Sequence, residues 1–158
     1  MKRPGFTLIE ALMAVMLLGL AIAALVGANT AFTHANGVGA ELSTSEFLLE
    51  QIRELTTTMP TIDPETEDTM FGPEEASLAN YDDVDDFDGA SFSPPIAGDR
   101  TVLSDFSAYR QTVKVENVSN SNFETVVGDH TSDFVRVTVD VFLGNKQVSS
   151  ARWIRARY

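Results

Sequence analysis

The carboxylates with the clearest chemical potential lie in one short run, "YDDVDDFDG", at residues 81–89. Hard cations such as Ca²⁺ prefer carboxylate and carbonyl oxygens, which closely spaced aspartates can supply. Placing Gly89 at the sixth position of an EF-hand loop puts Val84 at the first position, where that motif needs an acidic residue. The run therefore predicts either a calcium site of another geometry or a solvated acidic surface loop. The candidate ligands are Asp82, Asp83, Asp85, Asp86 and Asp88.

The other residues that could support catalysis do not follow a recognised pattern. His34 and His130 lack the HExxH spacing of a zinc site, and the chain has no cysteine that could supply a thiolate. Asp129, His130 and Ser132 are close in the sequence, but catalytic triads are defined by geometry and not by adjacency. The GxSxG, GxGxxG and P-loop motifs are all missing from the sequence. We therefore expect a protein that is not an enzyme and requires no cofactor, with Ca²⁺ as the one candidate ligand.

The size and net charge of the chain limit the partners that it is expected to bind. The 158 residues are enough for about one domain. Asp and Glu number 23 against 11 Lys and Arg, so the formal net charge is −12. Nucleic-acid phosphates and anionic lipid surfaces both attract basic proteins, so this balance argues against either as a docking partner.

Glu10 lies at the edge of an apolar run that is long enough to cross a membrane. Residues 11–28 carry no charge, and a helix over residues 6–28 spans about 35 Å, close to the thickness of a bilayer core. This run is longer than the apolar part of a secretory signal peptide. Lys2 and Arg3 precede it, which predicts a cytoplasmic N-terminus and an exported C-terminal body. A carboxylate at this depth is costly unless it is paired or reaches the interface.

The residues Gly5-Phe6-Thr7-Leu8-Ile9-Glu10, followed by this apolar helix, resemble the N-terminal signal of type IV pilins and type II secretion pseudopilins. The resemblance implies that a prepilin peptidase cleaves between Gly5 and Phe6, and that the new Phe6 amine is methylated. It also implies that Glu10 of one subunit meets the Phe6 amine of its neighbour in a filament. The expected partners are therefore prepilin peptidase, other pilin subunits and the inner membrane, with no nucleic acid.

Three functions remain open at this point. The acidic run is similar to a segment of minor pilins, including those of mannose-sensitive haemagglutinin pili, which favours a minor pilin of a type IV pilus or a related filament. A type II secretion pseudopilin would carry the same N-terminal motif. The third alternative is an uncleaved single-span anchor that presents a periplasmic calcium- or ligand-binding domain, and it gives Glu10 no role. In the first two, the subunit starts in the inner membrane with a periplasmic head and then enters a pilus or pseudopilus.

The rest of the sequence predicts an α+β head, in which a long N-terminal helix packs on a C-terminal antiparallel sheet. Apolar residues recur at helical spacing up to Met59, and Pro60 is expected to end that helix. Glycines between Gly27 and Gly39 are expected to loosen it locally. The segments "YRQTVKVENVS" and "DFVRVTVDVFL" alternate as strands do, and Gly144-Asn145 suits a hairpin turn before a returning strand.

These patterns predict five consecutive segments. They are a cytoplasmic leader (1–5), a transmembrane and filament-core helix (6–28), an amphipathic helix continuing into the head (29–59), an acidic connecting region (60–100) and an antiparallel sheet (101–158).

Overall fold

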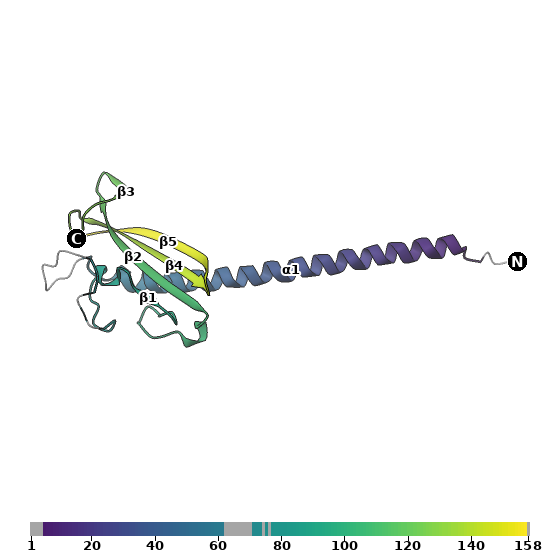
Figure 1. Ribbon diagram of the computed structural model, residues 1–158, viewed down its shortest axis with the longest axis horizontal. Helices are drawn as coiled ribbons and strands as arrows, with labels where there is room; N and C mark the ends of the chain where they lie inside the picture. The colour runs from purple at the N-terminus through teal and green to yellow at the C-terminus, as the bar shows by residue number, and fades with distance from the viewer. Residues whose placement is uncertain (1–4, 62–70, 74, 76, 158) are drawn as a thin grey trace. The chain divides into compact units, whose positions relative to one another are not determined.

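The computed structural model describes residues 5–61, 71–73, 75 and 77–157, so the predicted leader lies outside it except for Gly5 (Figure 1). One long helix and an antiparallel sheet confirm the predicted α+β, pilin-like fold. The chain divides into two compact units, residues 1–40 and 41–158. The elements are α1 (Leu8–Thr57), η1 (Asp85–Phe87), β1 (Ser91–Phe92), η2 (Ser104–Phe106), β2 (Tyr109–Ser119), β3 (Asn122–Val126), β4 (Phe134–Leu143) and β5 (Lys146–Ala156).

The first unit contains the N-terminal part of α1. Every described side chain of residues 5–40 is exposed, including the large apolar ones. By length and composition, α1 is able to cross a membrane. The helix is continuous through Gly27–Gly39, where the hydroxyls of Thr30 and Thr33 donate to the carbonyls of Val26 and Asn29, each at 3.0 Å. These bonds satisfy polar side chains inside an otherwise apolar helix.

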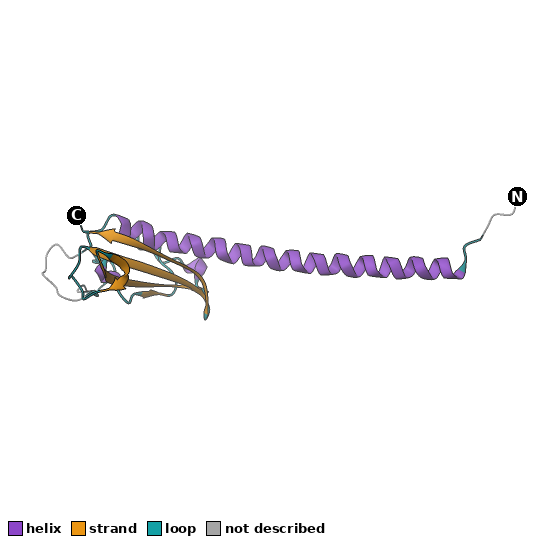
Figure 2. Cartoon of the chain, turned by 90° about the horizontal axis from the view of Figure 1, so that it is seen from above, coloured by secondary structure: helices purple, strands orange, loops and turns teal. Residues whose placement is uncertain are grey.

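The second unit is built around the C-terminal turns of α1. Leu48, Leu49, Ile52 and Leu55 form one buried stripe that packs with the valines of β2 and β4. Figure 2 shows the strands lying alongside this part of α1. Leu42, which precedes this stripe at helical spacing, is 43% exposed and lies outside the core. The helical spacing therefore predicted the buried face correctly from Ser45 onward.

The sheet has the order β1-β2-β4-β5, with all neighbours antiparallel and β3 paired to β2. Val135, Val137, Val139 and Val141 of β4 are buried, as the alternation predicted. The turn between β4 and β5 contains Gly144 at φ +58°, a conformation that suits glycine and the predicted hairpin. Trp153 of β5 is half-buried against the core.

The segment between α1 and β2 is more than the acidic connecting region that its composition predicted. It contributes β1 to the edge of the sheet. Neither β1 nor β3 was predicted from the sequence. Buried Gln111 of β2 holds this segment, because its Oε1 accepts from the Ile96 N–H at 2.8 Å and its Nε2 donates to the Leu48 carbonyl at 2.7 Å. Gln111 thus ties the part of this segment around Ile96 to both the helix and the sheet.

Candidate functional site

The first candidate site is the segment around the predicted cleavage point. Gly5, Phe6 and Thr7 lie just before the first turn of α1, and the Phe6 side chain is 79% exposed. Both sides of the Gly5–Phe6 peptide bond are therefore outside regular structure. A peptidase needs an accessible peptide bond outside regular structure, which is how the structure places Gly5 and Phe6.

Glu10 forms a capping box with Thr7 at the start of α1. The Glu10 N–H donates to Thr7 Oγ1 at 3.3 Å, and the Thr7 N–H donates to Glu10 Oε2 at 3.4 Å. The Thr7 hydroxyl also donates to the same carboxylate at 3.2 Å. These bonds satisfy amide groups that would otherwise lack partners at the helix start. The spacing Thr7-Leu8-Ile9-Glu10 is the sequence signature of this capping box. The capping box was not predicted from the sequence, where Glu10 was interpreted as a partner for another subunit.

The second candidate site is the acidic run, and its carboxylates are not equivalent. Asp83, Asp85 and Asp86 are at most 1% exposed, whereas Asp82 is exposed. Val84 and Phe87 are fully buried, and the Phe87 ring packs edge-to-face against Tyr81 with centroids 5.1 Å apart. A solvated surface loop would not bury three of its carboxylates. The expectation of such a loop is therefore wrong for this part of the run.

Reciprocal hydrogen bonds hold the buried turn. Asp86 Oδ2 accepts from the N–H groups of Asp82 at 2.9 Å and Asp83 at 3.4 Å, while Asp83 Oδ1 accepts from the Asp86 N–H at 3.1 Å. Asp88 has a different task, because its Oδ1 accepts from the Val115 N–H of β2 at 2.8 Å. Asp88 thus ties the run to the sheet and does not join the other carboxylates.

The structure brings together a different set of carboxylates from the five aspartates that the sequence suggested. Oxygens of Glu75, Asp82 and Asp86 lie within 4.8 Å of one another. Glu75 precedes the acidic run by several residues, so spacing within the run gave no signal for it. Burial raises the pKa of Asp86 above its ordinary value, although hydrogen bonds to its ionised form oppose that shift. Burial, followed by the charges of Asp86 and Glu75, also raises the pKa of the Tyr81 hydroxyl.

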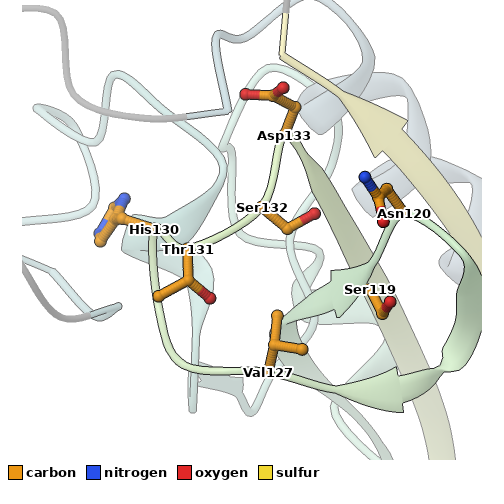
Figure 3. Close-up of a pocket in the computed structure, with 7 residues that line it drawn as sticks. All are labelled: Ser119, Asn120, Val127, His130, Thr131, Ser132 and Asp133. Atoms are coloured by element: carbon orange, nitrogen blue, oxygen red, sulfur yellow. The ribbon is translucent and has the colours of Figure 1, made fainter.

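His130 contacts the acidic run and does not form a catalytic triad with Asp129 and Ser132. His130 Nε2 lies 3.4 Å from Asp85 Oδ2. Asp129 Oδ2 instead accepts from the Phe71 N–H at 3.3 Å, and Ser132 Oγ accepts from the Phe134 N–H at 3.2 Å. Figure 3 shows the side chains of His130 and Ser132 pointing in opposite directions at the edge of a pocket of about 280 Å³. Within the described residues, this trio has no nucleophile and base in contact.

The arginines near the C-terminus also have partners inside the head. Arg155 of β5 donates through Nη1 to the Thr56 carbonyl at 2.6 Å and through Nη2 to the Met59 carbonyl at 2.9 Å. Arg152 donates to Glu124 Oε2 at 3.0 Å on the surface. Arg155 therefore caps the C-terminal end of α1, which the sequence alone did not reveal.

Comparison with known proteins identifies the N-terminal segment. Residues 1–26 match the family model described as the prokaryotic N-terminal methylation motif. No curated protein and no solved structure matches the chain. The motif covers Gly5, Phe6 and Glu10, on which the predicted resemblance to type IV prepilins rested, and it supports that resemblance. The chain thus carries the N-terminal methylation motif of a type IV pilin-like prepilin, joined to a pilin-like α+β fold.

Proposed function

We propose that the protein is a structural, non-catalytic subunit of a type IV pilus or a related filament. Prepilin peptidase cleaves it between Gly5 and Phe6, and the Phe6 amine is methylated. The observation that carries this proposal is the methylation motif over residues 1–26, followed by helical residues 8–40 whose side chains are all exposed. Such an apolar surface requires a cover, which the inner membrane supplies before assembly and neighbouring subunits supply in the filament.

Glu10 has two tasks under this proposal. In the isolated chain its carboxylate caps α1 through Thr7. In the filament it pairs with the Phe6 amine of a neighbouring subunit, which offsets the cost of placing a charge in an apolar core. The capping box supports this second task because it holds the carboxylate at a fixed place one turn from the new amine.

A minor pilin is the form of this function that we favour. The likeness of the acidic run to minor pilins supports it, as does a head in which that run is built into the core. The head then lies in the periplasm before assembly and on the filament surface afterwards, where it contributes to adhesion. A type II secretion pseudopilin is the alternative, and quantitative mass spectrometry of sheared filaments separates them. A minor pilin is present in pili at a small fraction of the major subunit, whereas absence from pili excludes it.

The first test is the N-terminal mass of the protein isolated from its native membranes. The proposal predicts a chain that begins at methylated Phe6. A chain that still begins at Met1 overturns the proposal and favours an uncleaved membrane anchor with a periplasmic binding domain.

The second test separates the two tasks of Glu10. Glu10→Gln keeps an acceptor for the capping box but removes the charge, so we expect normal cleavage and at least about a tenfold loss of incorporation into filaments. Thr7→Val is the matched control, because it removes the capping hydroxyl and keeps the carboxylate. It is expected to be incorporated at near-normal levels. If Thr7→Val fails to assemble while Glu10→Gln assembles normally, capping is the only task and the proposed pairing is wrong.

A further inference from the structure

We propose that the head binds one hard divalent cation, Ca²⁺, through the carboxylates of Glu75, Asp82 and Asp86. This inference concerns the second unit alone and does not depend on cleavage or filament assembly. It also changes the ligand set that the acidic run suggested, because Glu75 is added and Asp83, Asp85 and Asp88 are no longer included.

The geometry of the three carboxylates suits one shared ion. Their oxygens lie within 4.8 Å of one another. Calcium–oxygen distances are about 2.3–2.6 Å, so oxygens on opposite sides of one calcium ion are separated by about 5 Å. A single ion placed among these oxygens can therefore contact all three side chains. Calcium also tolerates irregular coordination and completes its shell with water or carbonyl oxygens, which suits a site with one exposed member, Asp82.

Two buried carboxylate oxygens without hydrogen-bond partners support this site independently of the spacing of the trio. Asp86 is 1% exposed, and its Oδ1 has no hydrogen-bond partner, although the residue is part of the trio. Asp83, fully buried beside it, has an Oδ2 without a partner as well. An ionised carboxylate removed from water is costly unless a cation or hydrogen bonds compensate it. The buried turn thus holds acceptor capacity that the described side chains do not use.

The basic side chains near the acidic run contact atoms other than the carboxylates of Asp83 and Asp86 in the described part of the chain. Arg100 donates to the backbone carbonyls of Leu78, Ala79 and Tyr81, just before the run. His130 approaches Asp85, and in the described part of the chain neither Asp83 nor Asp86 forms an ion pair with Lys, Arg or His.

The alternative is a pair of carboxyls, from Glu75 and Asp86, that share one proton. Such a pair would need no metal, and its stability would respond to pH but not to Ca²⁺. A calcium titration therefore decides between the two.

The experiment uses the full chain in detergent micelles, stripped of metal with EDTA. The single tryptophan, Trp153, lies against the core, so its emission reports thermal unfolding of the head. We expect saturating Ca²⁺ to raise the Tm by about 5–10 °C, since binding to the native state stabilises it. No change in Tm at millimolar Ca²⁺ overturns the proposal.

Matched variants test the ligand set. Asp82→Asn alters an exposed side chain and Glu75→Gln a half-buried one, so each is expected to fold in EDTA and to lose most of the calcium-dependent rise in Tm. Asp88→Asn makes the same change of charge within the run but retains an acceptor for the Val115 N–H, and it should keep the full rise. If Asp82→Asn and Glu75→Gln respond to Ca²⁺ as the native chain does, the proposed site is wrong.

Discussion

The two parts of α1 have the same backbone conformation and opposite surroundings. In residues 8–40, every described side chain is exposed, and residues 11–28 are all apolar or glycine. In residues 41–57, one face that includes Leu48, Leu49, Ile52 and Leu55 is buried against the sheet, while Leu42 and Phe47 remain exposed. A helix that is apolar all round needs lipid or other chains as its surroundings, whereas an amphipathic helix can find its partner within its own domain. The difference marks, within one helix, the boundary near residue 40 between the exposed part of α1 and the part that belongs to the head.

The two ends of α1 differ in a second way. Its N-terminal end is capped by Thr7 and Glu10, which are neighbours in the sequence. Its C-terminal end is capped by Arg155, which comes from the last strand. The first cap can form as soon as the helix does, whereas the second requires the sheet to be in place. The C-terminal part of α1 is therefore coupled to folding of the head.

The largest expected effect comes from truncating one leucine in each part of α1. Leu48 is fully buried, so Leu48→Ala should lower the free energy of unfolding of the head by about 2–5 kcal/mol. Leu18→Ala makes the same change on an exposed part of the helix and should alter it by less than about 0.5 kcal/mol. Urea unfolding followed by Trp153 emission measures both. An equal loss in the two variants would mean that residues 8–40 also support the folded head.

A smaller effect is expected from the buried amide that joins the helix to the sheet. Gln111→Met removes the hydrogen bonds to Leu48 and Ile96 and leaves the Ile96 N–H without its acceptor, which should cost about 2–3 kcal/mol. Gln147→Met is the control, because Gln147 is exposed and donates only to Asp140 at the surface. Urea midpoints and slopes of the two variants provide the comparison. A loss in Gln111→Met no larger than in the control would contradict the inferred role of Gln111.

The C-terminal cap should contribute less than the core. Lysine cannot reproduce the forked donors of arginine, so Arg155→Lys should lower the free energy of unfolding by about 1–2 kcal/mol. The control Arg152→Lys affects an exposed ion pair with Glu124 and should cost at most about 0.5 kcal/mol. Thermal unfolding of each variant measures the loss. Equal losses would show that Arg155 acts only as a surface charge.

The features that could be predicted from the sequence are those with local signatures. The alternation of β4 and the Gly144 turn depend on neighbouring residues, and both were predicted correctly. The capping box of Thr7 and Glu10 was equally local, although it was missed. By contrast, Gln111, Arg155 and Glu75 act on residues that are distant in the sequence or outside a recognisable motif. Their roles depend on the tertiary arrangement, which no spacing within a segment encodes.

The smallest predicted effect concerns the helix between Gly27 and Gly39. No side chain of this segment is buried, and its glycines each cost roughly 1 kcal/mol relative to alanine. We therefore expect its amides to exchange faster than those of residues 42–55 when the full chain is measured in detergent micelles, since local opening needs less free energy there. Gly37→Ala should slow this exchange about fivefold, because an added Cβ at Gly37 meets no atom within 4 Å. If amides of residues 27–39 in the native chain exchange as slowly as those of residues 42–55, helix propensity alone stabilises residues 27–39. Packing against the sheet would then add little to the stability of residues 42–55.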